Sequence, residues 1–139
     1  MREILFRGKA VNRDNGYRRT EYKNGDWVYG LLTRPYDERF EELPAEMTNT
    51  LGISGIEVDH ESVGQYIGLL DKNGTKIFEG DIVRDAETSD VGKIFFDTYT
   101  AMFVIGFETT IADFNASYSL EVIGNIYDNS ELIGGETNG

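Results

Sequence analysis

The chain has 139 residues, of which 40% are hydrophobic and 27% charged, and it contains no cysteine. This composition is typical of a globular protein, and it excludes a disordered chain, a disulfide framework and thiolate metal sites. The net charge of -12 disfavours binding to nucleic-acid phosphates, and no apolar run approaches the roughly 18 residues of a membrane span.

Short runs of aromatic and β-branched residues, separated by glycine-containing turns, predict a mainly β protein. In chain order, the predicted strands span 3–11, 26–32, 53–59, 63–70, 76–78, 81–84, 91–96, 101–107 and 119–126. Short strands at this spacing favour a small closed or half-closed barrel, because closure removes the exposed edges of a sheet.

The breaks between the predicted strands carry turn residues. Asn15–Gly16 and Asn24–Gly25 are tight-turn signals, because asparagine and glycine tolerate positive φ. His60–Ser62 is expected to turn the chain between two strands. The segment 34–52 holds both prolines and a charge run, and we interpret it as a long excursion with a helical turn near 38–43.

Charge is distributed unevenly along the chain. Residues 1–40 hold nine Lys or Arg and six Asp or Glu (+3), whereas residues 41–139 hold four and nineteen (-15). From the strand order we predict an N-terminal β-meander at 1–60, a barrel part at 61–133 and a frayed tail at 134–139. We expect the chain to unfold as one cooperative unit.

The stretch QYIGLLDKNGTKIFEGDIV, residues 65–83, concentrates acids and glycines and is a candidate metal or catalytic loop. Counted from Asp71, an EF-hand calcium loop needs glycine at its sixth and glutamate at its twelfth position, where this chain has Lys76 and Ile82. A hairpin turn explains the same residues: Asn73–Gly74 would supply positive φ, and Asp71 would accept hydrogen bonds from nearby amides. We therefore prefer the structural interpretation.

Glu79, Asp81 and the single histidine, His60, are the remaining candidates for chemistry. Two carboxylates around a glycine could serve as acid and base, but a turn into a strand uses the same residue types. One histidine without cysteine cannot build a zinc site, so His60 is expected on a surface turn. We predict no catalytic residue, no metal and no cofactor, and keep these three residues as candidates for binding.

A basic cluster near the N-terminus is the predicted protein-contact surface. With the single tryptophan it comprises Arg7, Lys9, Arg13, Arg18, Arg19 and Trp27. Because the rest of the chain is acidic, another copy of the chain is a suitable partner. The aromatic residues that alternate along strands are expected in the core; they are Trp27, Tyr29, Phe78, Phe95, Phe96, Phe103 and Phe107.

Four segments resemble the YopX family, whose members are small proteins of bacteriophages and prophages. They are MREILFRGK at 1–9, NGDWVYG at 24–30, ESVGQYIGLLDKNGTKIFEGDIV at 61–83 and EVIGNIYDNSEL at 121–132. The resemblance implies several coiled β-sheets, including an SH3-like barrel that we place in the C-terminal half, and it implies self-association. It supplies no catalytic residue.

These observations predict a cytoplasmic, non-enzymatic phage or prophage accessory protein that acts through protein contacts as a homo-oligomer. A host or phage protein is a further possible partner, whereas membrane and direct nucleic-acid binding are not expected. Absence of cysteine fits a reducing cytoplasm, and the charged start does not resemble a signal peptide. Two alternatives stay open: an acidic decoy that imitates nucleic acid and occupies a host DNA-binding protein, and a small-ligand binder or enzyme with its site near Glu79 and Asp81.

Overall fold

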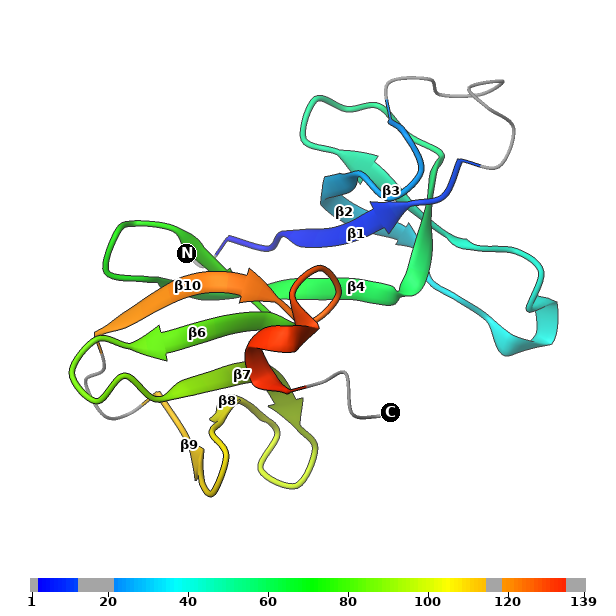
Figure 1. Ribbon diagram of the computed structural model, residues 1–139. Helices are drawn as coiled ribbons and strands as arrows, with labels where there is room; N and C mark the ends of the chain where they lie inside the picture. Colours follow the sequence, from blue (N-terminus) through cyan, green and yellow to red (C-terminus); the bar gives the residue numbers. More distant parts are fainter. Residues whose placement is uncertain (1–2, 13–21, 115–118, 135–139) are drawn as a thin grey trace. The chain divides into compact units, whose positions relative to one another are not determined.

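The computed structural model describes residues 3–12, 22–114 and 119–134, which are mainly β (Figure 1). The strands are β1 (Phe6–Ala10), β2 (Trp27–Arg34), β3 (Ala45–Asn49), β4 (Ile56–Leu70), β5 (Lys76–Phe78), β6 (Asp81–Asp85), β7 (Val91–Asp97), β8 (Met102–Gly106), β9 (Ile111–Ala112) and β10 (Leu120–Asn125). Two 3-10 helices, η1 (Glu38–Phe40) and η2 (Ser130–Ile133), accompany them. The prediction of a mainly β fold is confirmed.

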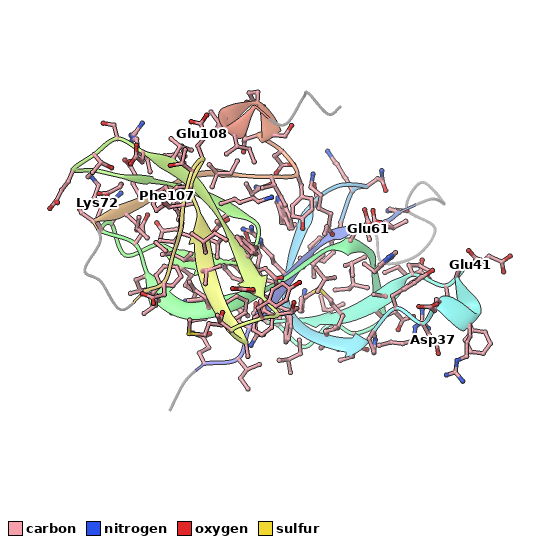
Figure 2. The ribbon with its side chains drawn as sticks, turned by 90° about the horizontal axis from the view of Figure 1, so that it is seen from below. Asp37, Glu41, Glu61, Lys72, Phe107 and Glu108 are labelled. Carbon is pink, nitrogen blue, oxygen red and sulfur yellow. The ribbon has the colours of Figure 1, made fainter. Side chains whose placement is uncertain are left out.

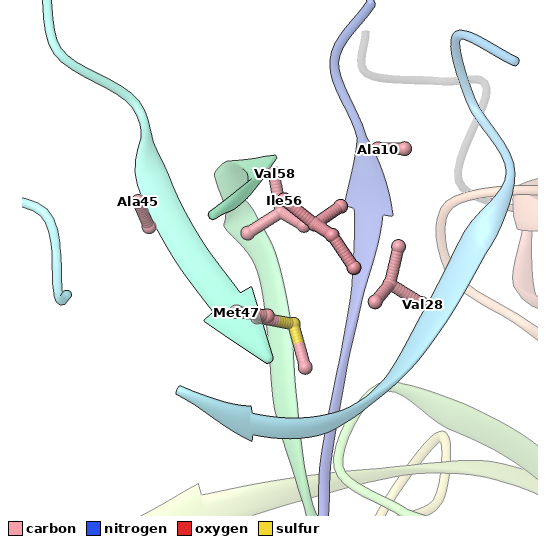
Figure 3. Packing of buried hydrophobic residues seen from close by; sticks show 6 residues of the cluster. All are labelled: Ala10, Val28, Ala45, Met47, Ile56 and Val58. Atoms are coloured by element: carbon pink, nitrogen blue, oxygen red, sulfur yellow. The ribbon is translucent and has the colours of Figure 1, made fainter. Parts of the chain in front are cut away.

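Contacts divide the chain into unit 1, Met1–Gln65, and unit 2, Tyr66–Gly139. In unit 1, β1 pairs with β2 and β4, β2 with β3, and β3 with β4, all antiparallel. These four strands therefore form a closed circuit, which leaves none of them as a free edge. The core cluster lies among them and consists of Ala10, Val28, Ala45, Met47, Ile56 and Val58 (Figure 3).

The predicted excursion at 34–52 is longer than the real one, because β3 occupies Ala45–Asn49. Alanine, glutamate and asparagine are poor strand formers, so this segment carries little local β signal. Ala45 and Met47 are buried in the core of unit 1, and this burial compensates for the weak propensity. The predicted helical turn appears as the short helix η1.

The predicted turn at His60–Ser62 is wrong, because β4 runs through it without interruption. Instead, the register between β1 and β4 shifts here, as it does at a β-bulge. The Ser62 hydroxyl accepts a hydrogen bond from the Lys9 amide (2.8 Å) and donates one to the Asp59 carbonyl (2.6 Å). The polar residues thus satisfy backbone groups that the bulge leaves outside the ladder.

Unit 2 contains an antiparallel sheet in the order β10-β6-β7-β8-β9, and the end of β4 pairs with β5. Its core cluster consists of Ile67, Ile77, Val83, Ile94, Ile105 and Leu120. Within the described residues no pairing joins β9 to β10, so this sheet is not closed by hydrogen bonds. The SH3-like barrel in the C-terminal half stays a prediction, as does cooperative unfolding of the whole chain.

The turn between β4 and β5 is held by one left-handed residue, Gly74, with φ of +84°. Asn73, expected to share this conformation, does not have positive φ, so that part of the prediction is wrong. A Cβ atom on Gly74 would meet nothing within 4 Å, which leaves backbone strain as the only cost of a side chain.

Gly74→Ala is therefore expected to lower the free energy of unfolding by about 1–2 kcal/mol, the cost of left-handed backbone for an L-residue. Denaturant unfolding followed by circular dichroism measures it. Gly74→Asn is the matched control and should lose less, because asparagine tolerates this conformation. An alanine variant as stable as the parent protein would contradict a strained turn.

Candidate interaction site

Asp71, in the stretch that first suggested a metal loop, is a buried structural carboxylate. Its Oδ1 accepts hydrogen bonds from the amides of Asn73 (2.8 Å) and Thr75 (2.9 Å), and its Oδ2 accepts one from the amide of Val122 (2.9 Å). Burial alone would raise the pKa of Asp71, but these three donors and the charge of Lys72 outweigh it, so the pKa is lowered. The carboxylate ties the β4–β5 turn to β10.

Asp81 and Asp85 have similar roles in neighbouring turns of unit 2. The buried Asp81 Oδ2 accepts a hydrogen bond from the Phe78 amide at 2.7 Å, which closes the turn between β5 and β6 around Glu79. Asp85 Oδ1 accepts one from the Glu87 amide at 3.0 Å. Over 3–12, 22–114 and 119–134, no three Asp, Glu or His side chains gather closely enough to hold a metal ion.

His60 lies in unit 1, whereas Glu79 and Asp81 lie in unit 2. The exposed imidazole stacks on Tyr36, with ring centroids 3.8 Å apart and planes 9° apart. Both rings line a cleft of about 280 Å³, which the carboxylates of Glu41, Glu42 and Asp59 also border. The stack thus joins the excursion after β2 to strand β4.

Unit 2 has a larger cleft of about 740 Å³ between β7, the β8–β9 turn and η2. Its apolar wall includes Phe107 and Leu132, and Glu108 and Lys93 contribute charge; Phe107 and Glu108 are labelled in Figure 2. No sequence motif marked this cleft, because its walls come from three separate segments. Neither of the two predicted binding carboxylates of unit 2 lines it.

Three of the predicted contact residues come together on unit 1. Strand register places Arg7 opposite Tyr29 and Lys9 opposite Trp27. The Arg7 guanidinium carbon lies 4.7 Å from the centre of the Trp27 ring, and the Lys9 ammonium lies 5.4 Å from it, both within cation–π range. Arg7 is 5% exposed, so it contacts the indole as a buried side chain. The other predicted contacts, Arg13, Arg18 and Arg19, lie outside the described residues.

Trp27, Tyr29 and Leu31 alternate along β2 with the core residues, and so they share its outer side. Tyr29 is 40% exposed and Leu31 is 51% exposed. The expectation of a core position is therefore wrong for Tyr29, as it is in unit 2 for Phe96, which is 41% exposed. Lys9 borders this set on the neighbouring strand. We call Lys9, Trp27, Tyr29 and Leu31 the β2 face. The sequence signal for it is a strand that is apolar on both sides.

The sequence model of the YopX protein family matches residues 14–134. This chain is a member of the YopX family. The YopX resemblance inferred from the four sequence segments is thereby confirmed. No curated protein matches the sequence.

A solved structure shares the fold of this YopX protein. The crystal structure of protein EF1440 from Enterococcus faecalis aligns with a TM-score of 0.53 and 22% sequence identity, over 96% of this chain and 99% of that one. At this identity the likeness concerns the fold alone. No helix in the part of the chain that the structure describes is long and apolar enough to cross a membrane.

Proposed function

We propose that this YopX protein is non-enzymatic and acts through protein contacts as a homo-oligomer. The β2 face is the observation that carries the proposal. Tyr29 and Leu31 are exposed there. Beside them, Arg7 and Lys9 make cation–π contacts with the Trp27 ring. Aromatic residues such as tyrosine and tryptophan are enriched where proteins meet, since they combine a large apolar area with a polar group.

The setting that the family resemblance implies belongs to the same proposal. We place the protein among phage and prophage accessory proteins of the bacterial cytoplasm. Another copy of the chain is the first partner that we propose, and a host or phage protein is a further one.

Three buried carboxylates are unavailable to the two alternatives. Asp71, Asp81 and Asp85 are buried in turns and bonded to backbone amides, so they cannot join a surface array that imitates DNA phosphates. Asp81 is occupied by the Phe78 amide, which also weakens the case for a ligand or catalytic site near Glu79 and Asp81.

Leu31→Glu is expected to reduce the mass of the protein in solution from that of an oligomer to that of a single chain. The added charge would have to be desolvated in an apolar contact, which is costly. Light scattering on a size-exclusion column measures the mass. High salt should also favour smaller species if Lys9 contributes. Charges interact over roughly one Debye length, which is about 3 Å at 1 M salt and about 8 Å at 0.15 M.

Leu51→Glu is the matched control. Leu51 is 85% exposed in a turn of unit 1 and lies outside the β2 face, so the same substitution there should leave the mass unchanged. A parent protein that remains a single chain at every concentration would overturn the proposal.

A further inference from the structure

The excursion between β2 and β3, residues 35–44, exposes apolar side chains at its end. We call it the finger; Asp37 and Glu41 mark its outer end in Figure 2. Its short helix η1 has no buried residue. Phe40 is 57% exposed, and Leu43 is exposed as well. The Arg39 guanidinium carbon lies 5.8 Å from the centre of the Phe40 ring, and the ring is still exposed. A projecting segment with two exposed apolar side chains is suited to contact another surface.

The finger is anchored to the rest of unit 1 near its base. Arg34 closes the base, since its Nη2 donates to the Pro44 carbonyl at 2.6 Å and its Nη1 lies 3.1 Å from the Glu46 carboxylate. Tyr36 stacks on His60. A segment ordered before it binds loses less conformational entropy on binding than a mobile one.

The charge of the finger is negative at its exposed end. Asp37 caps η1 and binds Arg39 through both carboxylate oxygens, at 2.7 Å for the shortest contact. The side-chain hydrogen bond from Arg39 lowers the pKa of Asp37, so this pair is charged and mutually neutralised. The remaining charges of η1 and its flank are three exposed glutamates, which are Glu38, Glu41 and Glu42.

The finger and the β2 face are complementary. The finger presents Phe40 and Leu43 beside carboxylates, whereas the β2 face presents Tyr29 and Leu31 beside Lys9. We infer that the finger of one copy docks on the β2 face of a second copy. The inference rests on the proposed self-association and specifies its two surfaces. Both surfaces belong to the same chain, which is why a second copy is the partner.

A contact between two different patches is heterologous. Repeating it adds subunits head to tail, which produces a closed ring or an open chain. Each subunit then uses its finger once and its β2 face once. This arrangement differs from a symmetric dimer, in which one patch meets its own copy, and the difference can be tested by mixing variants.

The test uses two full-length variants: a finger variant, Phe40→Ser with Leu43→Ser, and a face variant, Leu31→Glu. Each variant alone should run as a single chain, because it lacks one side of the contact. Mixed in equal amounts, they should form a heterodimer of one finger variant and one face variant, and nothing larger. The intact finger of the face variant then meets the intact β2 face of the finger variant. Light scattering measures the masses, and circular dichroism checks the folding of each variant.

A second finger variant keeps the test independent of folding defects. Glu38→Lys with Glu41→Lys changes only exposed charges. It should weaken self-association about tenfold or more, because the new lysines of one copy would repel Lys9 of the other. Its matched control is Glu87→Lys with Asp90→Lys in unit 2, which should associate as the parent does.

The outcomes separate the two proposals. If the parent protein is a single chain, self-association fails and this inference fails with it. If the face variant is a single chain but both finger variants assemble like the parent, self-association stands and the finger contact is overturned. Two single-chain variants whose mixture yields no heterodimer overturn it as well, because an intact finger and an intact β2 face then fail to bind each other.

Discussion

Gly30→Ala is expected to lower the free energy of unfolding by more than about 3 kcal/mol, at the upper end of overpacking effects. A Cβ atom on Gly30 would lie 1.9 Å from the Thr48 carbonyl oxygen and 2.7 Å from the Asn49 Cα. Both are backbone atoms of β3, so no side-chain rotation can relieve the overlap. Strands β2 and β3 would have to separate, and the closed circuit of unit 1 would open between them.

Gly8→Ala is the matched control on the same circuit. A Cβ atom there would meet side-chain atoms of Met47 and Val58 at 3.2 Å, and a methionine can adjust. Denaturant unfolding of both variants should therefore show a much smaller loss for Gly8→Ala. Equal losses would mean that the β2–β3 contact at Gly30 is not as close as the structure has it.

Local sequence signals predicted most strands but not the pairing that closes unit 1. The core positions Val28, Ile56 and Val58 follow an alternation that is visible in the sequence. Strand β3 was not predicted, because its residues have weak strand propensity and depend on burial between β2 and β4. Strand propensity describes a residue in its local segment, whereas β3 forms because it pairs with strands that are distant in the sequence.

The continuity of β4 was hidden for a related reason. His60–Ser62 has the polarity of a turn, and it does form an irregularity, but within a strand. Its backbone groups are satisfied by Ser62 bonding to Lys9, which is 53 positions away in the chain. A partner at that separation leaves no local trace.

The candidate site was predictable in its residue types and not in its geometry. The basic cluster and Trp27 stood out in composition, and the structure brings Arg7 and Lys9 onto the Trp27 ring. The exposure of Leu31 required knowing which side of β2 faces the core. The base of the finger is closed by Arg34, which donates to the Pro44 carbonyl ten positions away, and no local propensity predicts this contact.

Asp71→Asn, in the acid-rich turn between β4 and β5, is the second substitution with a large expected effect. It should destabilise unit 2 by about 2–3 kcal/mol at neutral pH, which is within the range for hydrogen bonds to a charged group. The amide oxygen can still accept from Asn73 and Thr75. Its NH₂ group would then face the Val122 amide, which is also a donor, and that bond is lost. Asp97→Asn is the matched control, because Asp97 also accepts a turn amide, from Tyr99, but is more exposed.

The pH dependence separates a charged-acceptor role from simple packing. The pKa of Asp71 is lower in the folded than in the unfolded protein, where it is about 3.9. Folding is thus stabilised by the ionised form; the contribution is complete above about pH 5 and is lost as the pH falls through the folded pKa. The stability difference between the parent and Asp71→Asn, measured by denaturant unfolding from neutral pH to about pH 3, should therefore shrink with acid, because a protonated Asp71 resembles asparagine. A difference that stays constant over this range would show that the ionised carboxylate is not what holds the turn to β10.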